Sequence, residues 1–150
     1  MIEKVGDFWA ETGDAHVITT NGTIKTNGAC VMGRGVALQA RNRFPGIDKF
    51  LGTIISEKGN HVHSLGEWTR ADGATHHIFS FPVKINYWEN ATLAMIRYSV
   101  RELVIQVPPA FQKVVMVRPG CGNGNLVWDV VREELRVILN DRFVIVERNA

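Results

Sequence analysis

Residues 28–35 have the sequence Gly28-Ala29-Cys30-Val31-Met32-Gly33-Arg34-Gly35, and this stretch decides the fold. It follows a short segment rich in β-branched residues and precedes a segment in which Val36, Ala40 and Phe44 recur at helical spacing. The first N–H groups of a helix lack partners within the helix, and glycine lets the backbone approach an anion closely. The stretch therefore predicts an anion-binding turn between a strand and a helix.

A second glycine-rich turn occupies residues 119–125, Pro-Gly-Cys-Gly-Asn-Gly-Asn. It follows the apolar run 113–117 and precedes a helical pattern that begins at Val127. We expect this turn to lie at the start of that helix. Two such turns on separate strand–helix units predict a ligand with more than one phosphate.

The apolar residues alternate between strand and helix periods along the chain. Strands are predicted over 15–20, 61–65, 75–81, 113–117 and 142–146, in addition to a first strand before Asp7. Helices are predicted from 33 to 44, from 47 to a stop at Gly59, from 90 to 104 and from 127 to 139. This alternation predicts an α/β fold, a three-layer α/β/α sandwich around a mostly parallel, mixed sheet. Ligands bind at the carboxyl ends of such strands, where both glycine turns lie.

Length and composition narrow the class of protein. The length of 150 residues predicts one domain, 1–150. The net charge of +2 is too small to indicate that nucleic acid wraps around the protein, but it does not exclude a local basic patch. Both cysteines, Cys30 and Cys121, lie in the glycine turns, so we expect free thiols and a cytoplasmic protein. The N-terminus contains no long apolar run, so we expect neither a signal peptide nor a membrane partner, and we expect a monomer.

The histidines do not predict a metal site. His61, His63, His76 and His77 have no cysteine or carboxylate at the spacing of a metal-binding motif. Strand positions with one face in water account for them instead. We expect no metal and no cofactor.

Four motifs together resemble the macrodomain pattern, in order and in spacing: Gly6-Asp7, residues 26–28, residues 31–37 and residues 120–124. The resemblance covers nearly the whole chain. Macrodomains are α/β/α sandwiches that bind ADP-ribose, and some of them hydrolyse its conjugates. The resemblance implies that the partner is ADP-ribose or an ADP-ribosylated macromolecule, DNA included.

The resemblance also implies roles for individual residues. The carboxylate of Asp7 would accept a hydrogen bond from the adenine amino group, the first turn would hold a phosphate and the distal ribose, and the second turn would close over the diphosphate. The alternative for Asp7 is an aspartate that only stabilises a turn. The alternative for the two glycine turns is a tight strand–helix connection in which the glycines allow close packing. The implied ligand-binding residues are Asp7, Phe8, Gly28, Val31, Met32, Gly33, Arg34, Gly35, Val36, Gly120, Cys121, Gly122, Asn123, Gly124 and Asn125.

Two asparagines compete for one further role, the amide that faces the hydroxyls of the distal ribose. Thr20-Asn21-Gly22 and Thr26-Asn27-Gly28 are alike, and Asn27 has the better spacing before the first glycine turn. An amide donates and accepts at once, which suits a vicinal diol. We therefore expect Asn27 to orient the ribose and Asn21-Gly22 to form a hairpin turn.

Lys84 is the residue that the resemblance implicates in catalysis. Residues 81–88, Phe-Pro-Val-Lys-Ile-Asn-Tyr-Trp, resemble a segment of the macrodomains of bacterial antitoxins that remove ADP-ribose from thymidine in DNA. That branch groups with a human enzyme that removes terminal ADP-ribose from glutamate. A neutral amine would attack the anomeric carbon, and a charged one would stabilise a leaving oxygen or a phosphate. The alternative is a solvated loop lysine.

The second turn separates the two branches. The human enzyme has an aspartate there, whereas this chain has Gly124 between two asparagines, as in the antitoxin branch. We therefore expect hydrolytic removal of ADP-ribose from DNA or from a protein carboxylate. The alternatives are a phosphatase acting on ADP-ribose 1''-phosphate and a non-catalytic ADP-ribose reader. Among the aromatic residues, Tyr87 and Phe143 are candidates for ligand contact, and Trp88 and Trp128 are expected to pack.

Overall fold

A six-stranded mixed sheet forms the centre of the molecule, in a computed structural model that describes residues 1–148. The strand order is β1-β6-β5-β2-β4-β3. The pair β3–β4 is antiparallel and every other pair is parallel, so the predicted mostly parallel sheet is confirmed. The strands are β1 (Ile2–Gly6), β2 (Ala15–Thr20), β3 (His63–Thr69), β4 (Thr75–Pro82), β5 (Val114–Met116) and β6 (Phe143–Arg148).

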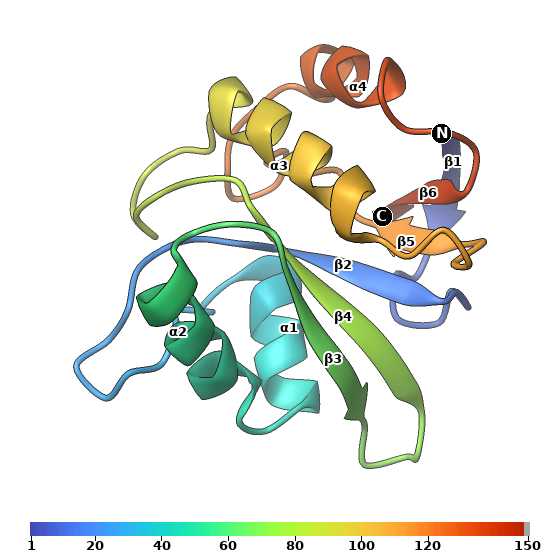
Figure 1. The fold of residues 1–150 in the computed structure, drawn as a ribbon. Coiled ribbons are helices and arrows are strands. Elements are labelled where there is room, and N and C mark those ends of the chain that lie inside the picture. Colours follow the sequence, from blue (N-terminus) through green and yellow to red (C-terminus); the bar gives the residue numbers. More distant parts are fainter. Residues whose placement is uncertain (149–150) are drawn as a thin grey trace.

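Helices cover both faces of the sheet, as Figure 1 shows: α1 and α2 lie on one face, and α3 and α4 on the other. Each face has its own apolar cluster, one built around Phe44, Leu51 and Ile78 and the other around Phe81, Ile96 and Leu135. The predicted three-layer sandwich is therefore confirmed. The helices are α1 (Gly35–Arg43), α2 (Ile47–Lys58), α3 (Leu93–Gln106) and α4 (Trp128–Arg136).

Several element boundaries differ from the predicted ones, because local turns displace them. The helix expected from residue 33 begins at Gly35, since Arg34 is extended (φ −147°, ψ 159°) and acts as the N-cap. The strand expected from residue 61 begins at His63, because the His61 N–H donates to the Gly59 carbonyl in a turn. Residues 33 and 34 are thereby left in a loop at the edge of the sheet.

A buried histidine pair links β2 to β4 near the amino ends of these strands. The Nδ1 atoms of His16 and His76 are 3.3 Å apart, and the His16 ring contacts Phe8 edge-on and stacks on Trp9. Burial, with His76 beside it, lowers the pKa of His16 to about 4. The unfolded chain binds a proton near pH 6.5, so protonation favours unfolding between pH 6.5 and pH 4.

We expect the free energy of unfolding to fall by about 2 to 3 kcal/mol between pH 7 and pH 4.5 because of His16 alone. Urea unfolding at the two pH values measures this loss. His16→Phe keeps an aromatic ring and removes the titrating group, so its unfolding free energy should depend less on pH. The matched control is the half-exposed His61, as His61→Gln. An unchanged pH dependence in His16→Phe would contradict the assignment.

Candidate functional site

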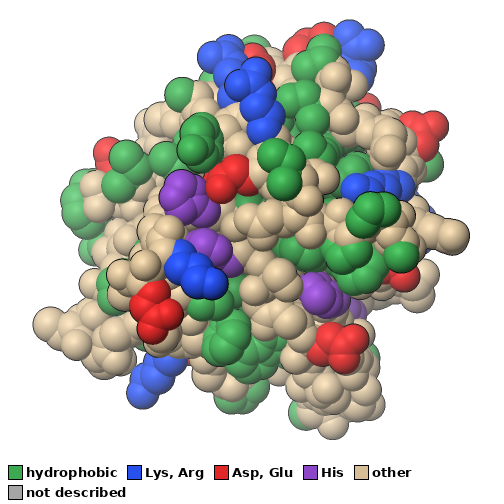
Figure 2. Space-filling view, viewed as in Figure 1, with side chains coloured by type: hydrophobic (Ala, Val, Ile, Leu, Met, Phe, Trp, Pro, Cys, Tyr) green, Lys and Arg blue, Asp and Glu red, His purple; other side chains and the backbone are tan. Residues whose placement is uncertain are grey.

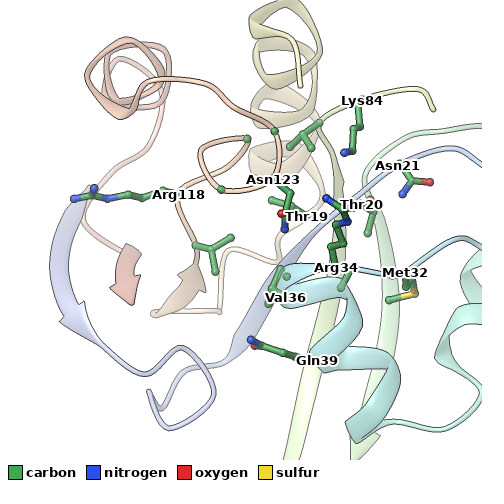
Figure 3. A pocket seen from close by; sticks show the side chains of 18 of the residues that line it. Thr19, Thr20, Asn21, Met32, Arg34, Val36, Gln39, Lys84, Arg118 and Asn123 are labelled. Carbon is green, nitrogen blue, oxygen red and sulfur yellow. The ribbon is translucent and has the colours of Figure 1, made fainter. Parts of the chain in front are cut away.

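A cavity of about 1140 Å³ lies at the carboxyl ends of the central strands (Figure 3). Side chains and backbone from the carboxyl ends of the five parallel strands, β1, β2, β4, β5 and β6, meet there, as expected for a sheet of this topology. The strand-end residues that line it are Gly6, Asp7 and Phe8 at the end of β1 and just after it, Thr19, Thr20 and Asn21 at the end of β2 and just after it, Val83 and Lys84 after β4, Val117 and Arg118 after β5, and Val146 and Arg148 of β6. Both glycine turns complete its wall.

The first glycine turn presents the N-terminus of α1 to the cavity. Gly35, Val36 and Ala37 line the cavity and form the first turn of the helix, so their N–H groups have no partner within α1. Gly33 is exposed, and a Cβ atom added there would meet nothing within 4 Å. Met32 also lines the cavity, with a side chain that is buried (Figure 3). The turn thus offers backbone donors and the positive end of a helix dipole to an anion.

The second glycine turn faces the first. The Nδ2 atom of Asn123 lies 3.3 Å from the position that a Cβ atom of residue 35 would occupy. Gly120 has a φ of +75°, and a Cβ atom at Gly124 would lie 2.5 Å from the Gly120 carbonyl oxygen. A side chain at position 124 would therefore not fit this turn.

The second turn differs from its expected arrangement in two respects. It does not begin α4, because Leu126 and Val127 separate it from the first helical residue, Trp128. Cys121 does not line the cavity, since its thiol is directed to the Pro119 carbonyl and packs against the core. The pKa of Cys121 is raised by burial, which does not favour a reactive thiolate.

Asn21 lies in the cavity, and Asn27 and Gly28 do not line it. The hairpin turn is formed by the second Asn-Gly pair: Gly28 has a φ of +88°, and the Lys25 N–H donates to the Ala29 carbonyl at 2.8 Å. The expectation that Asn21-Gly22 forms the hairpin is therefore wrong. The turn signal of an Asn-Gly pair was informative, but it did not distinguish two pairs six residues apart.

The Asn21 side chain is nearly buried and held at both ends of its amide. Its Nδ2 donates to the Val31 carbonyl at 2.9 Å, and its Oδ1 accepts from the Thr23 N–H at 2.9 Å. One amide hydrogen and one lone pair remain for other partners. Asn21 thus links the end of β2 to the first glycine turn.

Lys84 follows β4 and enters the cavity from the side opposite α1. In Figure 3 the side chains of Lys84 and Arg34 point toward each other. Partial burial and the positive charge of Arg34 lower the pKa of Lys84, and the carboxylate of Glu89 opposes this change. The lysine therefore has more neutral amine at a given pH than a solvated lysine would.

Asp7 is a turn aspartate that lies at the cavity. Its Oδ1 accepts a hydrogen bond from the Trp9 N–H at 2.9 Å, as a turn aspartate does, while the residue also lines the cavity. Its second oxygen is available to a ligand. Phe8, beside it, is buried and packs edge-on against Trp9 with ring centroids 4.7 Å apart.

Several cavity residues were not predicted from the sequence. The hydroxyl of Thr20 is buried at the cavity and has no hydrogen-bond partner among residues 1–148. On α1, Gln39 accepts a hydrogen bond from Trp9 Nε1 at 2.8 Å. Its position one turn after Gly35, on the helix that follows the glycine turn, is the signal that would have found it. Arg43, one turn further on, also lines the cavity, as expected for a basic rim beside the pocket, and its guanidinium lies 5.0 Å from the centre of the Trp9 ring.

Two aromatic expectations are also wrong. Trp88 does not pack in the core: it is 66% exposed and lines the cavity with Tyr87. Phe143 is buried in the apolar cluster that includes α4 and does not line the cavity. The difference arises because Trp88 lies in the loop between β4 and α3, whereas Phe143 begins an interior strand.

Metal ligands do not gather anywhere in the part of the chain that the structure describes: no three His, Cys, Asp or Glu side chains come together at coordinating positions within residues 1–148. Over the same range, every helix is too short or too polar to cross a membrane.

Comparison with known proteins supports the fold. No family model matches the chain. It is 28% identical over 130 residues to the DNA ADP-ribosyl glycohydrolase of Thermus aquaticus, a match that covers 84% of this chain and 35% of that protein. The chain therefore spans about a third of the length of this curated relative.

Solved structures agree. The macrodomain of Mycobacterium tuberculosis DarG has a TM-score of 0.81 at 24% identity, and that of Thermus aquaticus DarG a TM-score of 0.77 at 23%, each covering 99% of both chains. Thermosipho africanus DarTG, solved in complex with ADP-ribose, has a TM-score of 0.76 at 19% identity over 96% of this chain and 40% of its own. The chain has the macrodomain fold.

Proposed function

We propose that this protein binds ADP-ribose in the cavity and removes it hydrolytically from modified DNA. The observation that carries the proposal is the position of Lys84, whose amine enters the same cavity as the two glycine turns and has a lowered pKa. The similarity to a DNA ADP-ribosyl glycohydrolase and to the DarG macrodomains supports the choice of reaction and substrate.

In this proposal the ligand spans the cavity from β1 to β4. Asp7 binds the adenine, and the N–H groups at the start of α1 bind a phosphate. Asn123 and its neighbours cover the diphosphate from the other side. Asn21, rather than Asn27, orients the hydroxyls of the distal ribose, because Asn21 is the asparagine of the pair that lines the cavity.

Lys84 would then act at the anomeric carbon of the distal ribose. As a neutral amine it forms a bond from Nζ to this carbon while the bond to the base breaks and its electron pair leaves with the base, which takes up a proton from Nζ. Water then hydrolyses the Nζ–carbon bond and releases ADP-ribose. As a cation, Lys84 would instead stabilise the charge on the leaving group in a direct attack by water.

The proposal is tested by turnover of three substrates in parallel: thymidine-ADP-ribosylated DNA, glutamate-ADP-ribosylated protein and ADP-ribose 1''-phosphate. Calorimetry first establishes that the protein binds ADP-ribose. Release of ADP-ribose from DNA supports the proposal. Release from protein alone would show that the substrate is ADP-ribosylated protein and not DNA. Phosphate release alone would identify a phosphatase, and binding without any turnover would identify a reader.

The two asparagines provide a matched test of the ribose-binding role. We expect Asn21→Ala to lower kcat/KM about 10- to 100-fold, because the loss of an oriented hydrogen-bonding group costs about 1 to 3 kcal/mol. Asn27→Ala should leave kcat/KM within about twofold, since Asn27 supports only its own turn through the Ala29 N–H. Thermal unfolding of both variants corrects for any loss of folded protein. Equal effects of the two changes would contradict the assignment of Asn21.

A further inference from the structure

The loop between β4 and α3 carries an exposed aromatic pair at the mouth of the cavity. Tyr87 is 52% exposed and Trp88 is 66% exposed, and their rings meet edge-on with centroids 5.2 Å apart. Both residues line the cavity that receives Lys84. Large aromatic side chains left exposed beside a binding cavity mark a surface for contact with a partner.

Hydrogen bonds from neighbouring segments hold this loop in place. The Tyr87 N–H donates to Thr23 Oγ1 at 3.0 Å, and the Ile85 carbonyl accepts from the Gly22 N–H at 2.8 Å. On the other side, Asn125 Nδ2 donates to Asn90 Oδ1 at 2.8 Å. The two rings are therefore presented on an anchored loop, which suits a rigid contact surface.

The cavity is large and open to solvent on the side of this loop. Its volume of about 1140 Å³ lies at the upper end of the range for small-molecule pockets, about 300 to 1,000 Å³. The group joined to the distal ribose would leave the cavity near Lys84, where Tyr87 and Trp88 form the rim. A planar group at this point would meet one of the two rings, which stand nearly perpendicular to each other.

We propose that Tyr87 and Trp88 form a stacking platform for an unpaired base of the DNA strand that carries the ADP-ribose. This inference rests on the proposed function and adds residues that determine substrate specificity. Every base has a face that stacks on aromatic rings, whereas an acyl-linked peptide side chain such as glutamate has none. A base within a duplex is stacked on its neighbours and is not free to reach the rings, so the platform requires a single strand or an extruded base.

The charge near the platform fits a strand contacted over a short length. Arg34 and Lys84 line the same cavity and supply positive charge, while the Glu89 carboxylate accepts a hydrogen bond from the Asn86 N–H of the loop itself. Figure 2 shows one face of the molecule, on which acidic and basic side chains are interspersed. Around the cavity itself, the acidic Asp7 and Glu89 lie among the basic Arg34, Arg43, Lys84, Arg118 and Arg148. Specificity for DNA would therefore come from base stacking at the mouth of the cavity more than from contacts with many phosphates along the strand.

The test compares the double variant Tyr87→Ala/Trp88→Ala with Tyr98→Ala, a control residue on α3 that is 60% exposed and does not line the cavity. On a short single-stranded oligonucleotide carrying ADP-ribosylated thymidine, kcat/KM of the double variant should fall about 10- to 100-fold, the effect of about one to two lost stacking contacts. Its affinity for free ADP-ribose should stay within about twofold. The double variant Tyr87→Phe/Trp88→Phe should recover most of the activity, because stacking needs only the rings.

Unchanged kcat/KM for the oligonucleotide would overturn the platform, and so would an equal loss of affinity for free ADP-ribose. If the wild type turns over no substrate at all, the proposed hydrolase function is wrong. The stacking platform is then tested by DNA binding alone. Unmodified oligothymidylate should then quench the tryptophan fluorescence of the wild type, and Trp88→Phe should abolish that quenching. Absence of quenching in the wild type would reject the platform in that case.

Discussion

Lys84→Ala is expected to lower turnover of ADP-ribosylated DNA by at least about 100-fold, while its affinity for ADP-ribose stays within about threefold of the wild type. The amine would act on the anomeric carbon, so its loss affects the reaction far more than it affects binding. The side chain is only partly buried, and its truncation should leave the fold intact. The rate of ADP-ribose release at saturating substrate gives kcat, and calorimetry with ADP-ribose gives the affinity.

The pH profile and Lys84→Arg separate the two possible roles of the amine. If the neutral amine is the nucleophile, wild-type kcat rises with pH through the lowered pKa of Lys84, and Lys84→Arg is as inactive as Lys84→Ala because arginine stays protonated. If the cation stabilises the leaving group, kcat falls with rising pH and Lys84→Arg retains part of the activity. Turnover by Lys84→Ala at the wild-type rate would remove Lys84 from the mechanism altogether.

Gly33→Glu is expected to weaken binding of ADP-ribose by at least about 100-fold, or about 3 kcal/mol. Position 33 faces open space in the first glycine turn, so a side chain fits there without a clash. The glutamate would fill the phosphate site and place a negative charge where the ligand brings its own. Calorimetry with ADP-ribose measures the loss.

Gly33→Ala is the matched control, because it adds a methyl group without a charge at a position where a Cβ atom meets no neighbour within 4 Å. Its affinity should stay within about fivefold of the wild type, and both variants should unfold at the wild-type temperature. Near-wild-type affinity in Gly33→Glu would show that the phosphates bind elsewhere in the cavity.

The layers of the fold were predictable because hydrophobic periods report burial directly. The buried segment 15–20 and the helical stripe of α3 each identify one layer of the sandwich. The start of α4 was predictable to within one residue, because the apolar period begins at Val127 and the helix at Trp128. The separation of the second glycine turn from that helix was not, since nothing in residues 120–127 distinguishes a helix N-terminus from a loop that returns to pack on Ala91.

The candidate site was predictable to the extent that it consists of backbone. Glycines at 33, 35, 120 and 124 marked both turns, since their roles depend on the main chain. The choice between Asn21 and Asn27 depends on which strand end reaches the cavity, and that is set by the pairing of β2 with β4 and β5. The exposure of Trp88 likewise depends on tertiary anchoring, which a single sequence does not reveal.

The anchored loop that carries Lys84 has a thermodynamic consequence. Since the Gly22 and Tyr87 N–H groups already fix this loop to the segment after β2, the ligand does not have to order it. Binding then loses little conformational entropy, and the free and bound backbones should superpose closely. A preformed cavity of this kind lets product leave without the opening of a lid, so slow release is not built into the scaffold.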